Sequence, residues 1–338
     1  MATPVQLKNG LWRIRVGTGT DRTYFTAKTK REALAKAAEY MAGIRQKASR
    51  KTVGDALDEY LTVKQAVISP STYRGYLTLR RNAYITLENT DVDLLDTRAL
   101  QRWVSAYARQ YSPKGVRNAT SLLLSAVALY RPDAAFHLTL PQAKRPDLHT
   151  PDSSDISRLL DHVRAQGEPG KELLSAILLG AFGPLRRGEI CALLGSDLDH
   201  EACTVSVTKS MVETSEGGWI VKQPKTSSSY RKITMPAAIM AEIPQVAKQE
   251  RLIKAQPNQI TDRFKRAVKA TKITPIRFHD LRHYGASILH AWGLPDQYIM
   301  QRGGWQSDYV MKRVYRDTID EETARMDAII AEKVKGIV

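Results

Sequence analysis

The sequence predicts a multidomain, mainly α-helical protein with small antiparallel β-sheets, and three observations lead to this fold class. The chain has 338 residues, which is enough for two or three domains with separate hydrophobic cores. Apolar residues recur at helical spacing over most of its length. Alternating, strand-like patterns occur only near residues 12–27 and 203–235. We therefore expect helical domains, one small sheet near the start of the chain, and another sheet inside the largest domain.

Residues 1–50 are expected to form a small basic module of strands and one helix. Arg13 and Arg15 alternate with apolar residues between positions 12 and 16, which is the period of a strand with one buried face. Residues 23–27 can pair with this strand. Thr29-Lys30-Arg31-Glu32 has the pattern of a capping box and predicts a helix that continues to about residue 48. The excess of Lys and Arg favours DNA binding, with a solvated basic face as an equal alternative.

Residues 51–140 are predicted to form a bundle of four helices. Thr52 can cap the first helix, and the second, third and fourth helices are expected to start at Ser69-Pro70, Thr97 and Ser112-Pro113. Basic side chains on the second and fourth helices form a candidate phosphate-contacting face, for which ordinary solvated charge is the alternative. These residues are Arg74, Arg80, Arg81, Lys114 and Arg117.

Residues 141–151 have the composition of a linker and carry the basic residues Lys144 and Arg145. The remainder, residues 152–338, is expected to fold as one domain. Helices are predicted at about 153–166, 171–182, 238–252, 259–270, 280–292 and 295–302, with another beginning near Arg186. Strands at about 203–212, 219–222 and 230–235 predict a three-stranded antiparallel sheet on the flank of this domain.

The charge balance predicts a polyanionic partner. The formal net charge is +16, which favours nucleic acid first and an acidic membrane surface second. Cys191 and Cys203 are expected to be small buried hydrophobic residues rather than a disulfide or a metal site. The first residues lack an apolar signal core, and no run of about 18 apolar residues occurs, so we expect a cytoplasmic protein without a membrane partner.

The residues between 279 and 315 have side chains suited to chemistry on a phosphodiester. The run His279-Asp280-Leu281-Arg282-His283 is followed by Gly303-Gly304-Trp305 and then by Tyr315. An arginine fork can hold phosphate oxygens, a histidine can move a proton, and a tyrosine can attack phosphorus. A second arginine is available upstream in Arg186-Arg187-Gly188-Glu189.

In chain order, these motifs resemble the signature of the tyrosine recombinase (phage integrase) family. The matching elements are Arg186-x-x-Glu189, Lys225 beside the strands, His279-x-Leu281-Arg282-His283, Gly304-Trp305 and Tyr315. The whole chain also resembles the three-part layout of integrases from phages and conjugative transposons. That layout implies an arm-type DNA-binding module at 1–50, a core-binding domain at 51–140, a linker at 141–151 and a catalytic domain with a C-terminal helix at 152–338.

The resemblance implies roles for six residues. Tyr315 is the expected nucleophile, which would form a covalent 3′-phosphotyrosyl link, while Arg186 and Arg282 grip the non-bridging oxygens. His279 would assist deprotonation of the tyrosine, and Lys225 would protonate the leaving 5′-oxygen. Trp305, where histidine is more usual, would donate its indole N–H to the phosphate. No metal and no cofactor are expected, because the arginines supply the positive charge.

Several neighbouring residues compete for these roles. His283 is expected to be a structural histidine, and Arg187 a surface or DNA contact, because Glu189 lies at the family's spacing from Arg186. Lys222 competes with Lys225, whose Pro-Lys-Thr context favours it. The chain departs from the family pattern in three places: one extra residue between Trp305 and Tyr315, Asp317 in place of a histidine, and Gly303-Gly304 in place of Leu-Gly.

The resemblance implies a site-specific recombinase that integrates, and also excises, a mobile element. The alternatives are a catalytically inactive DNA-binding regulator of the same fold and a type IB topoisomerase-like enzyme that relaxes DNA. The expected partners are double-stranded DNA at core and arm-type sites and three further copies of the chain, with an excisionase and a DNA-bending host factor as further candidates. Such a protein would be nucleoid-associated in a bacterial host. Residues 321–335 have helical spacing and could pack on their own domain or on a neighbouring protomer.

Overall fold

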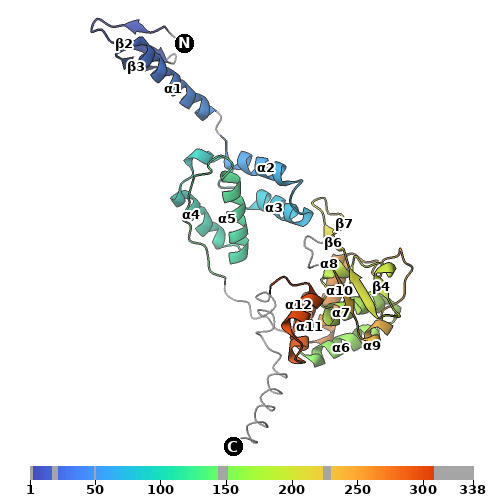
Figure 1. Ribbon diagram of the computed structural model, residues 1–338. Coiled ribbons are helices and arrows are strands. Elements are labelled where there is room, and N and C mark those ends of the chain that lie inside the picture. The colour runs from blue at the N-terminus through green and yellow to red at the C-terminus, as the bar shows by residue number, and fades with distance from the viewer. Residues whose placement is uncertain (1–2, 17–21, 49–50, 144–150, 224–229, 308–338) are drawn as a thin grey trace, which may run out of the picture. The chain divides into compact units, whose positions relative to one another are not determined.

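The computed structural model describes residues 3–16, 22–48, 51–143, 151–223 and 230–307 (Figure 1). The chain divides into two compact units, residues 1–144 and 145–338. Among the described residues, no helix is both long and apolar enough to cross a membrane. The predicted class, mainly helical with small antiparallel sheets, is confirmed.

The first part of the chain folds into a sheet covered by one helix. The strands are β1 (Val5–Gln6), β2 (Trp12–Val16) and β3 (Thr23–Ala27), paired antiparallel in the order β1-β2-β3, and the helix is α1 (Lys30–Ala48). Ile14 and Val16 of β2 are buried with Ala33 and Ala37 of α1. Arg13 and Arg15 alternate with these core residues and are exposed, as the period of the strand requires.

Residues 51–143 contain the predicted four-helix arrangement. The helices are α2 (Val53–Lys64), α3 (Pro70–Asn82), α4 (Thr97–Ala108) and α5 (Pro113–Val127), with a 3₁₀ turn at Val92–Leu94. Their N-caps are Thr52, Ser69, Asp96 and Ser112. The third helix begins at Thr97, as expected, and its N-cap is Asp96, whose carboxylate accepts the Ala99 amide proton at 2.6 Å.

The core of this bundle is aromatic and aliphatic, and it satisfies its buried polar atoms. Tyr84 donates from its hydroxyl to the carbonyl oxygen of Ala119 at 2.8 Å. Trp103 donates from its indole nitrogen to the carbonyl oxygen of Ala83 at 3.0 Å, and its ring stacks on Tyr84. By contrast, α3 buries no residue, so this helix lies on the surface of the bundle.

The second unit has a helical centre with strands on one flank, as Figure 1 shows. Its helices are α6 (Ser153–Arg164), α7 (Lys171–Phe182), α8 (Arg187–Ile190), α9 (Ala237–Ala241), α10 (Pro257–Thr271), α11 (Asp280–Ala291) and α12 (Asp296–Gly303). Short 3₁₀ turns lie at Glu168–Gly170 and Gly195–Asp197. Most of α7 is buried, and α6, α10 and α11 pack against it.

The strands of this unit differ from the predicted three-stranded sheet. The strands β4 (Leu198–Asp199), β5 (Thr204–Val207) and β8 (Arg231–Thr234) form one sheet in the order β4-β5-β8. A separate hairpin pairs β6 (Ser210–Glu213) with β7 (Trp219–Lys222). The expected single strand over 203–212 is broken where Lys209 forms an ion pair of 2.6 Å with Asp197.

The predicted helix over 238–252 was also wrong, because α9 ends at Ala241. Pro244 lies just beyond this end and disfavours helical backbone before it. Beyond this end, Ile243 and Leu252 are buried without forming part of a helix. The amide of Leu252, for example, donates to the carbonyl oxygen of Leu193 at 3.0 Å.

Close contact between α7 and α11 positions the segment that carries the His-x-Leu-Arg-His motif. A Cβ added at Gly285 would overlap the backbone carbonyl of Ala181, so only glycine allows this approach. Leu281 packs over Gly180 on the same contact surface. The placement of Arg282 therefore depends on small residues facing each other on two helices.

Replacing Gly285 with alanine should lower the free energy of unfolding of the second unit by about 1–3 kcal/mol, because a methyl group would have to displace packed backbone. The measurement is urea denaturation with hydrogen exchange of the α7 and α11 amides. Gly75→Ala is the matched control, since a Cβ there meets nothing within 4 Å and alanine favours helix by up to ~1 kcal/mol. Equal stability of Gly285→Ala and the parent would contradict the packing argument.

Candidate active site

Three segments of the second unit bring charged and aromatic side chains together. Arg186 precedes α8, His279 and Arg282 belong to the start of α11, and Trp305 follows α12. The ring of Trp305 contacts Arg282, and Arg186 contacts the backbone of Gly304. Two further sequence candidates, Lys225 and Tyr315, lie outside the described residues.

Arg186 is held by a neighbouring carboxylate and keeps an open edge. It occupies the N-cap position of α8, where its amide donates to Oε2 of Glu189 at 2.9 Å. Its guanidinium donates to Oε1 of Glu189 at 2.8 Å and to the carbonyl oxygen of Gly304 at 3.2 Å. The side chain is nevertheless 40% exposed. Glu189, three residues after Arg186, therefore orients the Arg186 guanidinium and leaves part of it accessible.

Glu189 is buried and is shared by two arginines. It is 3% exposed and accepts from Arg231 at 2.8 Å as well as from Arg186. Burial alone would raise the pKa of the Glu189 carboxyl, but the hydrogen bonds and charges of Arg231 and Arg186 hold that pKa below its ordinary value. Glu189 is thus an anion that fixes cations in place.

Arg282 is a buried cation with an unused donor. The residue is 2% exposed, and its guanidinium donates to the carbonyl oxygen of Pro184. The guanidinium carbon lies 3.9 Å from the centre of the Trp305 ring, a cation–π contact. Burial and then the charge of Arg186 lower the pKa of Arg282. One guanidinium nitrogen has no hydrogen-bond partner among the described residues, an arrangement that an anion would relieve.

His279 and His283 meet at the start of α11. Their rings are 4.9 Å apart and almost perpendicular. Although part of His279 remains exposed, desolvation by the surrounding protein lowers the pKa of His279 to about 4, and the charges of His283 and Arg282 contribute to this shift. The imidazole is therefore neutral at pH 7 and able to accept a proton. Burial also lowers the pKa of His283, whose Nδ1 lacks a partner within the described part of the chain.

The Gly303-Gly304 pair, a departure from the family pattern, has a local structural reason. A Cβ at Gly303 would overlap the Trp305 ring, which folds back over this residue. Gly304 ends α12 with φ of +65°, a conformation that glycine adopts without strain. The pair therefore allows the indole to reach Arg282 and the Gly304 carbonyl to reach Arg186.

Two arginines not predicted from the sequence support this cluster: the Arg231 side chain is buried, and Arg302 is half-buried. Arg231 of β8 donates to Glu189 and to the carbonyl oxygen of Arg302. Arg302 of α12 donates to the carbonyl oxygens of Thr234 and Phe182 at 2.8 and 2.9 Å. One sequence signal could have indicated the role of Arg231. It starts a predicted strand, and the alternation of that strand places residue 231 on the same side as the buried Ile233.

The remaining DNA-binding candidates fall into three groups. Exposed side chains belong to Arg13, Arg15, Arg74, Lys114 and Arg117. Arg80 donates to Asp58 and Glu88, and Arg187 donates to Thr261, so both have partners inside their own units. Lys144 and Arg145 lie outside the described residues.

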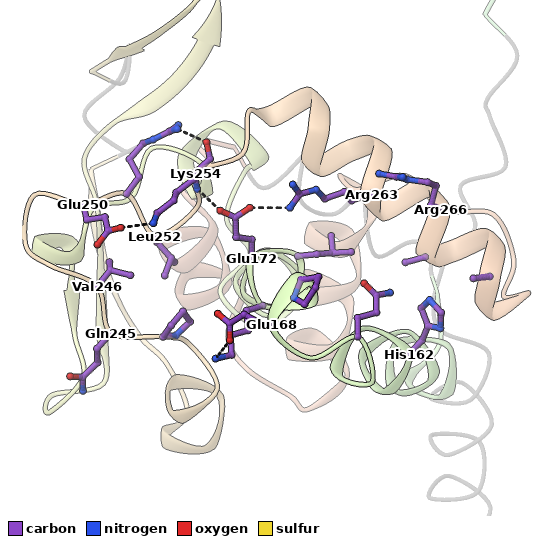
Figure 2. A pocket seen from close by; sticks show the side chains of 18 residues that line it. His162, Glu168, Glu172, Gln245, Val246, Glu250, Leu252, Lys254, Arg263 and Arg266 are labelled. Atoms are coloured by element: carbon purple, nitrogen blue, oxygen red, sulfur yellow. Dashed lines mark hydrogen bonds and ion pairs between the residues drawn. The ribbon is translucent and has the colours of Figure 1, made fainter.

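A separate cavity of about 910 Å³ lies in the same unit (Figure 2). Residues of α6 and α10 and of the segment 244–254 line it, and none of the catalytic candidates does. Its carboxylates are paired with cations, as the Glu172–Arg263 pair in Figure 2 illustrates. This cavity is therefore distinct from the arginine cluster.

Curated relatives of the chain are recombinases and integrases by name. A "Tyrosine recombinase XerC-like" protein of Caldanaerobacter subterraneus subsp. tengcongensis is 23% identical over 94% of this chain and 95% of its own length. The "Putative prophage phiRv2 integrase" of Mycobacterium tuberculosis is 28% identical over 38% of each chain.

Two sets of solved structures share the fold. The Tn1549 transposon integrase in complex with transposon right end DNA has a TM-score of 0.68, 18% identity, and coverage of 83% of this chain and 100% of its own. The lambda integrase tetramer bound to a Holliday junction has a TM-score of 0.58 and 15% identity, covering 92% and 94%. The phage integrase family model matches residues 151–322, which is half of the chain. The chain therefore belongs to the phage integrase family, as its motifs predicted.

Proposed function

We propose that this chain is a site-specific DNA recombinase that cleaves and rejoins strands through a 3′-phosphotyrosyl intermediate on Tyr315. The observation that carries the proposal is the buried Arg282 guanidinium with an unused donor, next to the partly open guanidinium of Arg186. A scissile phosphate bound here would supply the missing acceptor. Two fixed cations would then stabilise the charge that develops on the non-bridging oxygens.

The proton transfers follow from the remaining residues. The neutral imidazole of His279 accepts the proton of the Tyr315 hydroxyl as the tyrosine oxygen attacks phosphorus. The P–O5′ bond breaks, and Lys225 protonates the leaving 5′-oxygen. A 5′-hydroxyl from a second strand reverses these steps, so the bond is resealed without ATP. Trp305 holds Arg282 in place and offers its indole N–H to the phosphate.

The helical residues 51–140 supply the proposed contacts with the core site of the DNA. A groove of about 670 Å³ separates α3 from α5 and is lined by Arg74, by hydroxyl and amide side chains such as Ser71 and Asn118, and by the larger Tyr76 and Leu79. Lys114 and Arg117 are exposed on α5. Because α3 buries none of its residues, its outer surface is available to a partner. Positive side chains together with hydroxyl and amide groups suit phosphate contacts.

The residues 1–50 supply the proposed arm-site contacts, through the exposed face of the sheet that carries Arg13 and Arg15. Assembly in fours is proposed because lambda integrase forms a tetramer on a Holliday junction. Integration of a mobile element, with excision as the reverse reaction, is the reaction that such an assembly would perform.

Tyr315→Phe should abolish the covalent adduct with DNA, because the phenyl ring lacks the attacking oxygen, while changing DNA affinity by less than about 3-fold. The measurement uses a nicked substrate, with the adduct resolved by denaturing gel electrophoresis. Tyr298→Phe is the control, since Tyr298 is an exposed tyrosine of α12. An adduct on the Tyr315→Phe protein would place the nucleophile elsewhere.

Lys225→Ala should slow cleavage by about 100-fold or more, because the 5′-oxygen would leave without a proton donor. A substrate with sulfur at the 5′-bridging position needs no proton to leave and should restore the rate. Lys222→Ala is the matched control and should cleave both substrates normally. If sulfur rescues the Lys222 variant instead, Lys222 is the acid.

His279 should make the protein less stable as the pH is lowered. Its pKa is about 4 in the folded protein and 6.5 in the unfolded chain, so only the unfolded chain binds the proton between these values. The free energy of unfolding should therefore fall as the pH drops from 6.5 toward 4. His279→Gln removes this contribution, and urea denaturation at several pH values should give it a shallower slope. Parallel slopes would argue against a lowered pKa of His279 in the folded protein.

A further inference from the structure

We propose that Arg231 is a positioning residue that ties the two sides of the active site together and keeps the charge of Arg186 available for the phosphate. This inference rests on the proposed function. Arg231 would not touch the DNA: its side chain is 3% exposed, and it donates to Glu189 and to the backbone of Arg302 within the protein. Its influence would act through the residues that it holds.

One part of the Arg231 guanidinium holds the carboxylate that orients Arg186. Its two terminal nitrogens donate to the Glu189 oxygens at 2.8 and 3.3 Å. The same carboxylate accepts from the Arg186 amide and guanidinium. A change in the position of Glu189 would therefore be passed directly to Arg186.

The Nε atom of Arg231 holds the end of α12. It donates to the carbonyl oxygen of Arg302 at 2.9 Å, directly before the Gly303-Gly304-Trp305 turn. Arg302 in turn donates to Thr234 of β8 and to Phe182 at the end of α7. These reciprocal bonds fix the turn from which Gly304 reaches Arg186 and Trp305 reaches Arg282.

Arg231 also affects the net charge around Arg186, because both arginines pair with Glu189. With Arg231 present, the single negative charge of Glu189 is divided between two arginines. Without Arg231, Glu189 would pair with Arg186 alone, and the net charge of this pair would be close to zero. Arg186 would then offer less positive charge to a phosphate oxygen.

A lysine could not fully replace Arg231. The arginine uses Nε for Arg302 and its terminal nitrogens for Glu189, in directions set by one planar group. An ammonium group is a single point charge and cannot span both partners with the same geometry. Arg231→Lys therefore keeps the charge beside Glu189 but loses the bridge to α12.

The test is single-turnover cleavage of a nicked substrate by the full chain and by Arg231→Met and Arg231→Lys. Arg231→Met should slow adduct formation by roughly 100-fold, the scale on which small misplacements act, without a comparable loss of DNA affinity. Arg231→Lys should fall between this variant and the parent. Arg164→Met is the matched control, since Arg164 forms an equally short pair with Glu242 outside the arginine cluster.

A second substrate separates positioning from general damage. It carries a methylphosphonate at the scissile position, where a neutral methyl group replaces one charged oxygen and less charge must be stabilised. The deficit of Arg231→Met relative to the parent should shrink to a few-fold on this substrate. Urea denaturation of each variant reports whether the fold is kept.

The outcomes are distinct. The inference is overturned if Arg231→Met cleaves at the parental rate, or if its cleavage rate falls by the same factor on both substrates. Either result leaves the proposed function intact. A parent chain that forms no adduct through Tyr315 overturns the proposed function, and the inference with it. A deficit confined to the charged phosphodiester supports both.

Discussion

A single buried carboxylate, Glu189, is the group on which the candidate active site depends. A carboxylate removed from water is costly unless it is paired and hydrogen-bonded, and here Arg186 and Arg231 do both. The pairing requires α8, β8 and the end of α12 to meet at one point. The interactions that stabilise this one anion therefore also hold together the segments that form the arginine cluster.

The cluster contains more positive charge than its own anion can neutralise. Arg186, Arg231 and Arg282 surround the one carboxylate of Glu189, and the aromatic face of Trp305 compensates only part of the charge of Arg282. An excess of fixed cations in a partly dry site is the arrangement that stabilises charge developing on a phosphate, since little reorganisation is needed at the moment of reaction. Desolvation is the main cause of the lowered pKa of His279, and the nearby charges of His283, Arg282 and Arg186 lower it further.

The basic residues of the helical bundle serve two different purposes. In the helical bundle, Arg80 is used internally, since Asp58 and Glu88 accept its hydrogen bonds and hold α3 to its neighbours. The pKa of Arg80 is raised by these carboxylates. Other basic side chains of the bundle, such as Lys114 and Arg117, stay exposed. A net charge of +16 therefore includes cations that stabilise the fold as well as cations that face solvent.

The sequence by itself determined the family, the fold class and most helix positions, because capping residues and apolar spacing act within a few residues of each other. It also predicted Arg186 rather than Arg187 from the Glu189 spacing, which is a local contact. Only the tertiary structure decided which strands pair, that Arg80 is internally paired, and that Arg231 joins Glu189 to α12. Such contacts connect residues far apart in the chain, and no local pattern specifies them; folding places the partners side by side.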